Sequence, residues 1–301
     1  MRKTLDLLFV GLAIFILSGC SKSVNNRSSD IVKNNVTVQF GKMSQDKKRH
    51  IWLEVTSPNG ETGLSKDALV RSVLVSQNGK IESYSASPFA YEFPKDISYI
   101  DSRDENWQES SQFSNFKLSD INTLSDSQII AKAQKTDKLI LDKNLSELQL
   151  NVKNEIKTVN EEKYDNQNLK AVQIKLNENT LNTAKKLKYY GPKAKAVAIK
   201  ASTDATGNTI TSEKFNCPHV SFNLSKEETS PNDILVYKMS FTELTPFSLI
   251  YAFNSPQQIF KNYYTGYYEN SHQNLMLITK VSKNTKVKMD NKALEGLKVI
   301  D

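Results

Sequence analysis

The pattern of apolar and polar positions predicts a chain of β-strands interrupted by a few amphipathic helices. Strand-like segments share period-two alternation or short runs of β-branched and aromatic residues. They lie near residues 36–40, 51–55, 70–75, 219–224, 234–241, 247–253 and 275–281. Asn78-Gly79 joins two such runs and predicts a hairpin over 69–85, because a type I′ turn needs positive φ at both central residues. A second hairpin is predicted around 204–208.

Helical periodicity appears in the middle of the chain. Ser125 and Gln128 form a capping box, which predicts a helix over 126–138. Apolar residues then recur at spacings of three and four from Leu145 to Val159, which predicts a second amphipathic helix. The polar stretch that follows, near 160–168, marks a predicted boundary.

Two further helices are predicted in the second half. A short one near 181–187 precedes Gly191-Pro192, a typical helix terminator. Ser255-Pro256-Gln257-Gln258 resembles a helix start, with a Ser cap and Pro in the first turn. Ile259, Phe260, Tyr263 and Tyr264 would line one face of that helix. The C-terminal tail is expected to pair at a sheet edge.

These elements predict an α+β fold, mainly antiparallel β-sheet with a few packed amphipathic helices. Both halves contain strands, a hairpin and a capped helix, so the prediction leaves open two related modules. Their expected bounds are 36–165 and 166–301. Strands and helices do not alternate regularly, which disfavours a doubly wound solute-binding protein.

The N-terminus has the layout of an export signal. Met1-Arg2-Lys3 precedes eleven residues, 7–17, with no polar side chain. A membrane-spanning helix needs about 20 such residues, whereas eleven fit the apolar region of a signal peptide. The small residues Ser18 and Gly19 follow, so residues 1–19 are predicted to be a signal peptide.

The next residue changes the interpretation of this signal. Leu17-Ser18-Gly19-Cys20 resembles the lipobox of bacterial lipoproteins. The resemblance implies cleavage before Cys20, a diacylglyceryl group on its thiol, and a location on the extracellular face of the cell membrane. Two acyl chains hold a protein stably at a bilayer. Asp6 departs from the usual basic start; a plain secretory signal and an uncleaved anchor are the alternatives.

Composition adds few constraints on function. Residues 20–35 are polar and aperiodic and are expected to form a flexible tether. Loss of residues 1–19 leaves 38 Lys and Arg against 32 Asp and Glu, a mild excess that suits anionic lipids or acidic wall polymers. Nucleic acid is an unexpected partner at this location. With Cys20 acylated, only Cys217 keeps a thiol, so no disulfide within the chain is expected.

A wider resemblance covers most of the mature chain. The order of lipobox, polar tether, "VLVSQNGKIESYS", "LSDSQIIAKAQ", "STDATGNTITSE" and "SPQQIFKNYYTGYY" is similar to uncharacterised surface lipoproteins of low-GC Gram-positive bacteria of the lactic type. The resemblance supports location and implies no activity, cofactor or catalytic residue.

Candidate catalytic chemistry is sparse. Cys217 and His219, two apart on a predicted strand, would share a face as a thiol–imidazole pair. The alternative is a half-buried strand start in which Cys217 is a small apolar residue. His50, His219 and His272 share no metal-ligand spacing, so no metal or other cofactor is predicted. The chain also lacks a nucleophile elbow, a phosphate loop and a dinucleotide fingerprint.

Aromatic residues supply the candidates for ligand contact. Tyr99, Trp107 and Phe113 fall in a polar stretch, 86–118, that is expected to be an ordered surface loop; a strand within the stretch is the alternative. The group "YYTGYY" at 263–268 could also stack on sugars, but packing of a helix on a sheet explains most of it.

Three functions follow as hypotheses. The first is a non-enzymatic surface module that binds a cell-wall polymer, a surface protein or a small ligand. The second is an envelope hydrolase that uses Cys217 or carboxylates. The third is a transport-associated ligand-binding protein of unusual fold.

Overall fold

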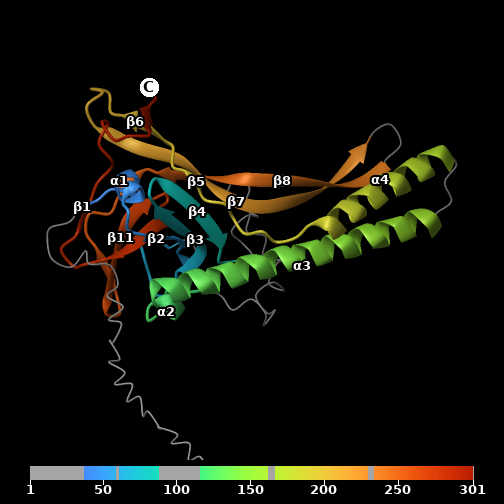
Figure 1. Cartoon of the computed structure of the whole chain (residues 1–301), viewed down its shortest axis with the longest axis horizontal. Coiled ribbons are helices and arrows are strands. Elements are labelled where there is room, and N and C mark those ends of the chain that lie inside the picture. Colours follow the sequence, from blue (N-terminus) through green and yellow to red (C-terminus); the bar gives the residue numbers. More distant parts are fainter. Residues whose placement is uncertain (1–36, 59–60, 88–115, 162–166, 230–233, 301) are drawn as a thin grey trace, which may run out of the picture.

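The computed structural model describes residues 37–58, 61–87, 116–161, 167–229 and 234–300, with backbone alone for 219–243. It confirms the α+β class: mostly antiparallel sheets with a few helices, including a long helix pair (Figure 1). The predicted lipidation site Cys20, the signal and tether, and the aromatic residues Tyr99, Trp107 and Phe113 lie outside the described residues.

An eight-stranded sheet, here the large sheet, forms the centre of the fold. Its order is β10-β11-β12-β2-β3-β4-β5, and β9 pairs with β11. Its strands are β2 (His50–Thr56), β3 (Leu69–Gln77), β4 (Lys80–Ser85), β5 (Lys195–Ala196), β9 (Tyr251–Ala252), β10 (Gln257–Ile259), β11 (Asn262–Tyr268) and β12 (Leu275–Val281). The predicted strands at 51–55 and 275–281 are therefore confirmed.

The predicted Asn-Gly hairpin is also confirmed. β3 and β4 pair antiparallel with Gln77 opposite Lys80. Asn78 and Gly79 between them have φ values of 52° and 70°, as a type I′ turn requires.

A four-stranded sheet, here the small sheet, packs above the large one. Its order is β14-β6-β7-β8, with β6 (Ile199–Thr203), β7 (Ile210–Thr229), β8 (Ile234–Leu249) and β14 (Leu297–Val299). β6 and β7 form the predicted second hairpin. β14 pairs parallel with β6 at the edge, which confirms the expectation for the C-terminal tail.

The first predicted strand is shorter than expected. β1 (Thr37–Val38) pairs only with β13 (Lys286–Val287), and Phe40 already begins the short helix α1 (Phe40–Gln45). The Asp290 carboxylate accepts hydrogen bonds from the backbone N–H groups of Gly41 (2.5 Å) and Lys42 (3.0 Å). The carboxylate thereby pairs two N–H groups that the start of a helix leaves without a partner. No local sequence pattern predicts this contact.

The two helices predicted at 126–138 and 145–159 are one. α2 (Leu118–Ile121) precedes α3 (Asp126–Glu161), which runs for 36 residues. Its start is as predicted: the backbone N–H of Ser125 donates to Gln128 Oε1 at 2.9 Å. The intervening residues contain no Gly or Pro that would end a helix.

α4 (Gln167–Lys186) is longer than the predicted 181–187 and ends before Gly191. It packs on α3 through Leu145, Leu148, Val152, Leu181 and Ala184, and it contacts β8. Figure 1 shows these helices and the outer ends of β7 and β8 projecting together from the sheets. We call the outer half of α3, with α4 and residues 219–243 of β7 and β8, the arm, and the remainder the head.

The helix predicted from Ser255 is wrong. Residues 257–268 form a β-hairpin, β10 and β11, with Ile259 opposite Asn262 and a tight turn at Phe260-Lys261. Aromatic side chains of β11 point to both faces of the large sheet, so they match a helical spacing without being helical. Tyr264 and Tyr267 are both buried.

Two hydrophobic clusters define three layers in the head. On one face of the large sheet, Leu53, Val73 and Ile278 pack against Ile129 and Ala133 of α3. On the other face, Trp52, Leu74 and Leu277 pack against the small sheet. Phe40 lies between the two sheets, stacked on Phe215 with ring centroids 4.1 Å apart and edge-on to Trp52 at 5.1 Å. Burial of such aromatic side chains is a major source of stability.

Strands from both predicted modules share the large sheet. β2, β3 and β4 come from residues 36–165, and β10, β11 and β12 come from residues 166–301. A shared sheet does not decide whether the halves are related, so that division stays a prediction. Among the described residues, no helix combines the length and apolar composition of a membrane span.

Candidate functional site

Cys217 does not have the environment of a nucleophile. Its side chain is fully buried between the sheets. Burial raises the pKa of its thiol to about 12, although a contact with Ser83 acts in the opposite direction. A thiol of that pKa is neutral at physiological pH, and the thiolate is the reactive form. The side chain of its predicted partner, His219, lies outside the described part of the structure.

The histidines with described side chains have separate roles. His50 Nε2 lies 2.9 Å from Asp46 Oδ2, four residues earlier, and closes the loop between α1 and β2. His272 is exposed in the turn between β11 and β12. Within the described ranges, no group of three or more His, Cys, Asp or Glu side chains has the geometry of a metal site.

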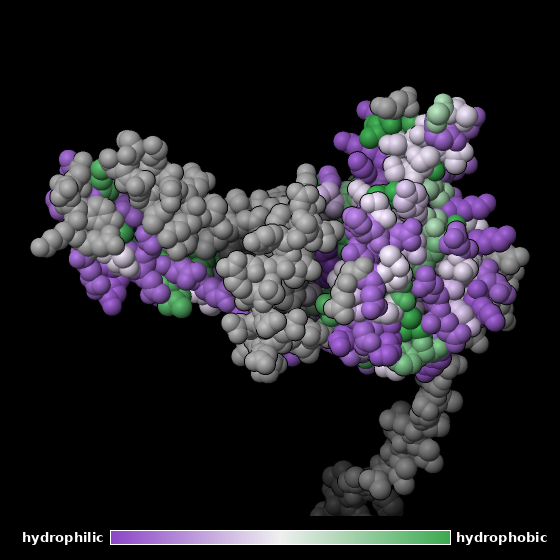
Figure 2. All heavy atoms as spheres, turned by 180° about the vertical axis from the view of Figure 1, so that it is seen from behind, coloured by the Kyte–Doolittle hydropathy of each residue, from purple (hydrophilic) through white to green (hydrophobic). Residues whose placement is uncertain are grey.

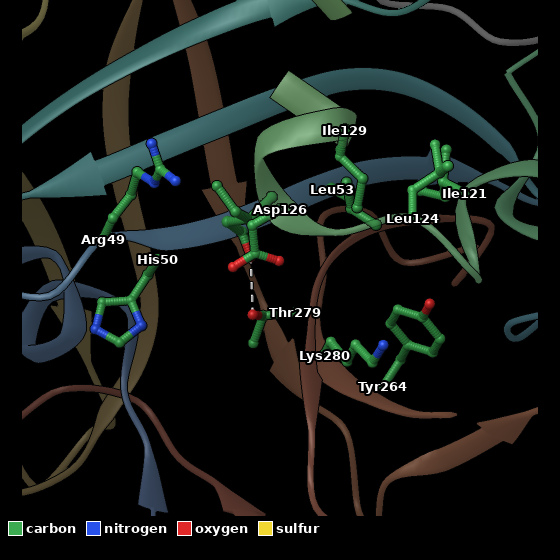
Figure 3. A pocket seen from close by; sticks show the side chains of 11 residues that line it. Arg49, His50, Leu53, Ile121, Leu124, Asp126, Ile129, Tyr264, Thr279 and Lys280 are labelled. Carbon is green, nitrogen blue, oxygen red and sulfur yellow. Dashed lines mark hydrogen bonds between the residues drawn. The ribbon is translucent and has the colours of Figure 1, made fainter. Parts of the chain in front are cut away.

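A small hollow lies where α3 begins beside the large sheet (Figure 3). Leu53, Ile121, Leu124 and Ile129 form its apolar side, and Arg49, His50, Asp126 and Lys280 form its polar side. Burial lowers the pKa of the Lys280 ammonium, while the Asp126 carboxylate counteracts that shift. The hollow has a volume of about 30 Å³. That space holds roughly two water molecules and cannot enclose a sugar or a peptide side chain.

Hydrogen bonds of Asp137 attach α3 to β4 and to the segment after α4. Asp137 Oδ2 accepts a hydrogen bond from Tyr189 at 2.7 Å, and its Oδ1 accepts one from the backbone N–H of Ser85 at 3.0 Å. Tyr84 donates to Glu82 Oε1 at 2.9 Å. Burial raises the pKa of Asp137, opposed by its bonds to Tyr189 and Ser85, and burial raises that of Tyr84 to about 12. These groups join β4, α3 and the segment after α4, which is a structural role.

A second group of buried acids lies at the end of the large sheet. Glu54 Oε2 accepts a hydrogen bond from Ser72 at 2.5 Å, and its Oε1 lies 3.9 Å from Arg71 Nη1. Burial, and then the charge of Glu54, raise the pKa of Glu269 well above its ordinary value. The Glu54 and Glu269 side chains are both buried, so they are not exposed to a substrate.

A third group of buried acids, Glu213 and Asp290, lies between the large and the small sheet. Glu213 is fully buried and its Oε1 accepts a hydrogen bond from the backbone N–H of Asp290 at 2.5 Å. The two residues are 77 positions apart, and neither lies in a motif. Sequence reasoning missed all three acid groups because each is assembled from distant segments, with no local spacing that could indicate it.

The aromatic group at 263–268 is structural. Tyr267 is fully buried; its hydroxyl donates to the Lys288 carbonyl at 2.8 Å and accepts from the backbone N–H of Phe40 at 3.1 Å. Tyr264 is buried on the opposite face of β11. These rings are therefore not available as a sugar platform. The prediction of ligand contact through Tyr99, Trp107 and Phe113 falls outside the described residues.

Comparison of the chain with models of protein families, with curated protein sequences and with solved structures found no match in any of the three.

Proposed function

We propose that this chain is a lipid-anchored surface protein that binds another component of the cell envelope and has no catalytic role. Acylation at Cys20 would hold it at the outer face of the membrane, and residues 21–35 would separate the head from the bilayer. The observation that carries the proposal is the arm. A long projection of two packed layers is suited to contacting a partner at a distance from the head.

The length of the arm supports a role in contacting a partner at a distance from the head. A helix of 36 residues is about 54 Å long at a rise of 1.5 Å per residue. Its N-terminal turns pack on the head through Ile129 and Ala133, and Asp137 bonds to Ser85 of β4. α4 returns alongside it and rests on β8. The arm therefore presents rigid helical surface away from the head.

Exposed apolar side chains on the arm support contact with a partner. Leu150 of α3 is 58% exposed, and Val172 and Leu176 of α4 are 48% and 40% exposed. Val172 and Leu176 are four residues apart and lie on the same side of their helix. On the face that Figure 2 draws, the coloured atoms of the arm are mostly hydrophilic, with a few apolar spots.

The two other hypotheses have less support. A thiol hydrolase would need an accessible, ionisable Cys217, and the thiol is buried with a raised pKa. A transport-associated protein would need a cavity for its solute, and the hollow beside α3 has room only for water-sized groups.

The anchor is tested by Cys20→Ala. The wild-type chain should fractionate with membranes and carry acyl mass on its N-terminal residue. The variant should appear in the medium or as unprocessed precursor. A variant that is processed and retained like the wild type would overturn the anchor.

Binding is tested with envelope fragments. The chain purified from expressing cells in a nonionic detergent should cosediment with isolated cell walls. The variant L150D/V172D/L176D should lose most of that binding. The control N154D/N179D/N182D adds the same charge at exposed polar positions of the same helices and should bind like the wild type. Failure of the wild-type chain to bind any envelope component would overturn the proposed function.

A further inference from the structure

Three lysines form a row across the small sheet. Lys298 of β14 is the register partner of Lys200 of β6, and Lys200 is the register partner of Lys214 of β7. Neighbouring strands are about 4.8 Å apart, so the row extends over roughly 10 Å of the sheet. We call Lys298, Lys200 and Lys214 the lysine row.

The lysine row lies on the outer face of the small sheet. All three side chains are exposed. The alternating residues Ile199, Phe215 and Leu249 are buried on the other face, against the large sheet. The row therefore faces solvent on a sheet that the core holds rigid beneath it.

Among the side chains that the structure describes, the outer face near the lysine row contains no acid. The other outward positions with described side chains are Ala198, Ser202, Ser212, Asn216, Leu244, Pro246 and Ser248. Among the described side chains, no carboxylate lies within ion-pair distance of any of the three ammonium groups. The charge of the row is thus uncompensated within the part of the chain that the structure describes.

An uncompensated row of this kind does not help the fold. Like charges directly opposite one another on neighbouring strands destabilise a sheet. A single Glu or Gln at position 200 would relieve the repulsion on both sides. Exposed cross-strand positions tolerate such residues, so packing gives no reason for three lysines here.

The chain leading into the row is also basic. Residues 185–200 contain six lysines and no acid. Lys185, Lys186, Lys188, Lys193, Lys195 and Lys200 are all exposed. This segment runs from the end of α4 through β5 to β6, so it extends the positive surface from the lysine row toward the arm.

We infer that this face binds a linear polyanion with repeating phosphodiester groups. The surface is a sheet face with no enclosing walls, so a small anion would meet one or two ammonium groups only. A flexible chain with repeated charges can pair with all three lysines and continue along residues 185–195. Lysine binds phosphate as a point charge without requiring the planar geometry that arginine and carboxylate share. The inference rests on the proposed extracytoplasmic location, where such polymers are encountered as wall components.

The test measures binding of the detergent-purified chain to poly(glycerol phosphate). The wild type should bind, and its affinity should fall as salt is raised from about 50 to about 300 mM, because salt screens exposed charges. K200Q/K214Q/K298Q should weaken binding by about tenfold, as expected for three exposed ion pairs. The control K135Q/K153Q/K175Q removes the same charge from exposed lysines of α3 and α4 and should change affinity less than about twofold.

Several outcomes would overturn the inference. Equal loss in both triple variants would show attraction to net charge alone, and no loss in the first would exclude the row. Equal binding of polyglutamate would exclude the phosphodiester class. Binding only to vesicles of anionic phospholipid would assign the row to a membrane surface. The thermal midpoint of K200Q/K214Q/K298Q should equal or exceed that of the wild type, which shows that the fold is intact.

The inference and the proposed function can fail separately. If K200Q/K214Q/K298Q cosediments with cell walls as the wild type does, the lysine row is not the polymer site and the binding role stands. If the wild-type chain binds no wall, no polymer and no surface protein, the proposed function itself fails.

Discussion

Glu213 and Asp290 meet in the core although 77 residues separate them: Glu213 Oε1 accepts a hydrogen bond from the backbone N–H of Asp290 at 2.5 Å. The Asp290 carboxylate in turn accepts hydrogen bonds from Gly41 and Lys42 at the start of α1. Three segments from the two ends and the middle of the chain are thereby joined. A buried polar network of this kind stabilises the fold only while each carboxyl group is in the protonation state that its hydrogen-bond partners require.

This pair makes stability depend on pH. Burial, and then the charge of Asp290, raise the pKa of Glu213 from 4.5 to about 8. Between those pH values the folded chain keeps a proton that the unfolded chain has lost. The free energy of unfolding should therefore fall as pH rises from about 5 to about 8, with a slope from Glu213 of up to about 1.4 kcal/mol per pH unit.

Glu213→Gln isolates that contribution. Glutamine keeps the acceptor oxygen and cannot ionise, so the variant should lose less stability over the same pH range. Denaturant unfolding at pH 5, 6, 7 and 8 measures the difference. Glu178→Gln, at an exposed position of α4, is the control and should parallel the wild type. Parallel profiles for Glu213→Gln and wild type would contradict the assigned pKa.

A second prediction concerns the thiol of Cys217. In a chain carrying Cys20→Ser, Cys217 is the sole thiol. Its pKa of about 12 in the folded state, compared with about 8.5 for a free cysteine, lowers the thiolate fraction roughly a thousandfold at pH 8. Labelling by a disulfide reagent should be slow in the native protein and rapid in denaturant. Rapid labelling of the native protein would restore the nucleophile hypothesis.

Local patterns predicted those elements that depend on a few neighbouring residues. The Asn78-Gly79 turn needs positive φ, and few other dipeptides supply it. The start of α3 follows from a capping box whose hydrogen bonds the structure contains. Strands β2 and β12 are rich in buried apolar residues and lie in the middle of the large sheet.

The prediction of a helix from Ser255 was wrong because two patterns fit the same residues. The apolar positions from Ile259 to Tyr264 match a helical stripe, but β11 is buried on both faces and so shows no alternation. The Ser255-Pro256 cap then favoured the wrong element. The buried acids and the lysine row left no signal of this kind, because their members come together only through strand register. Of the predicted site residues, Cys20, Tyr99, Trp107 and Phe113 lie outside the described ranges and stay predictions.

The β10–β11 hairpin, which lies where a helix was predicted, contains a residue in a strained backbone conformation. Phe260, in the turn between β10 and β11, has a φ of 52° and a side chain that is 56% exposed. A bulky residue is disfavoured in the left-handed region, where asparagine is common. Phe260→Asn should therefore raise the free energy of unfolding by about 1 kcal/mol. Phe260→Ala, which removes the ring without favouring positive φ, is the control and should gain less; equal gains would assign the effect to the ring.

The last prediction concerns the close packing of β11 against β12 at Gly266. A Cβ atom added to Gly266 of β11 would overlap the backbone carbonyl of Leu277 and lie 2.8 Å from Ile278 Cα on β12. Backbone atoms in the middle of a sheet cannot move aside as a side-chain end can. Gly266→Ala should therefore separate β11 from β12 and destabilise the fold by about 3 kcal/mol. Gly63→Ala, which has an open environment and a φ of 86°, should cost only about 1 kcal/mol for its backbone conformation. Chemical denaturation of both variants decides the matter: a loss at Gly266 no larger than that at Gly63 would mean that the two strands are not packed as closely as described.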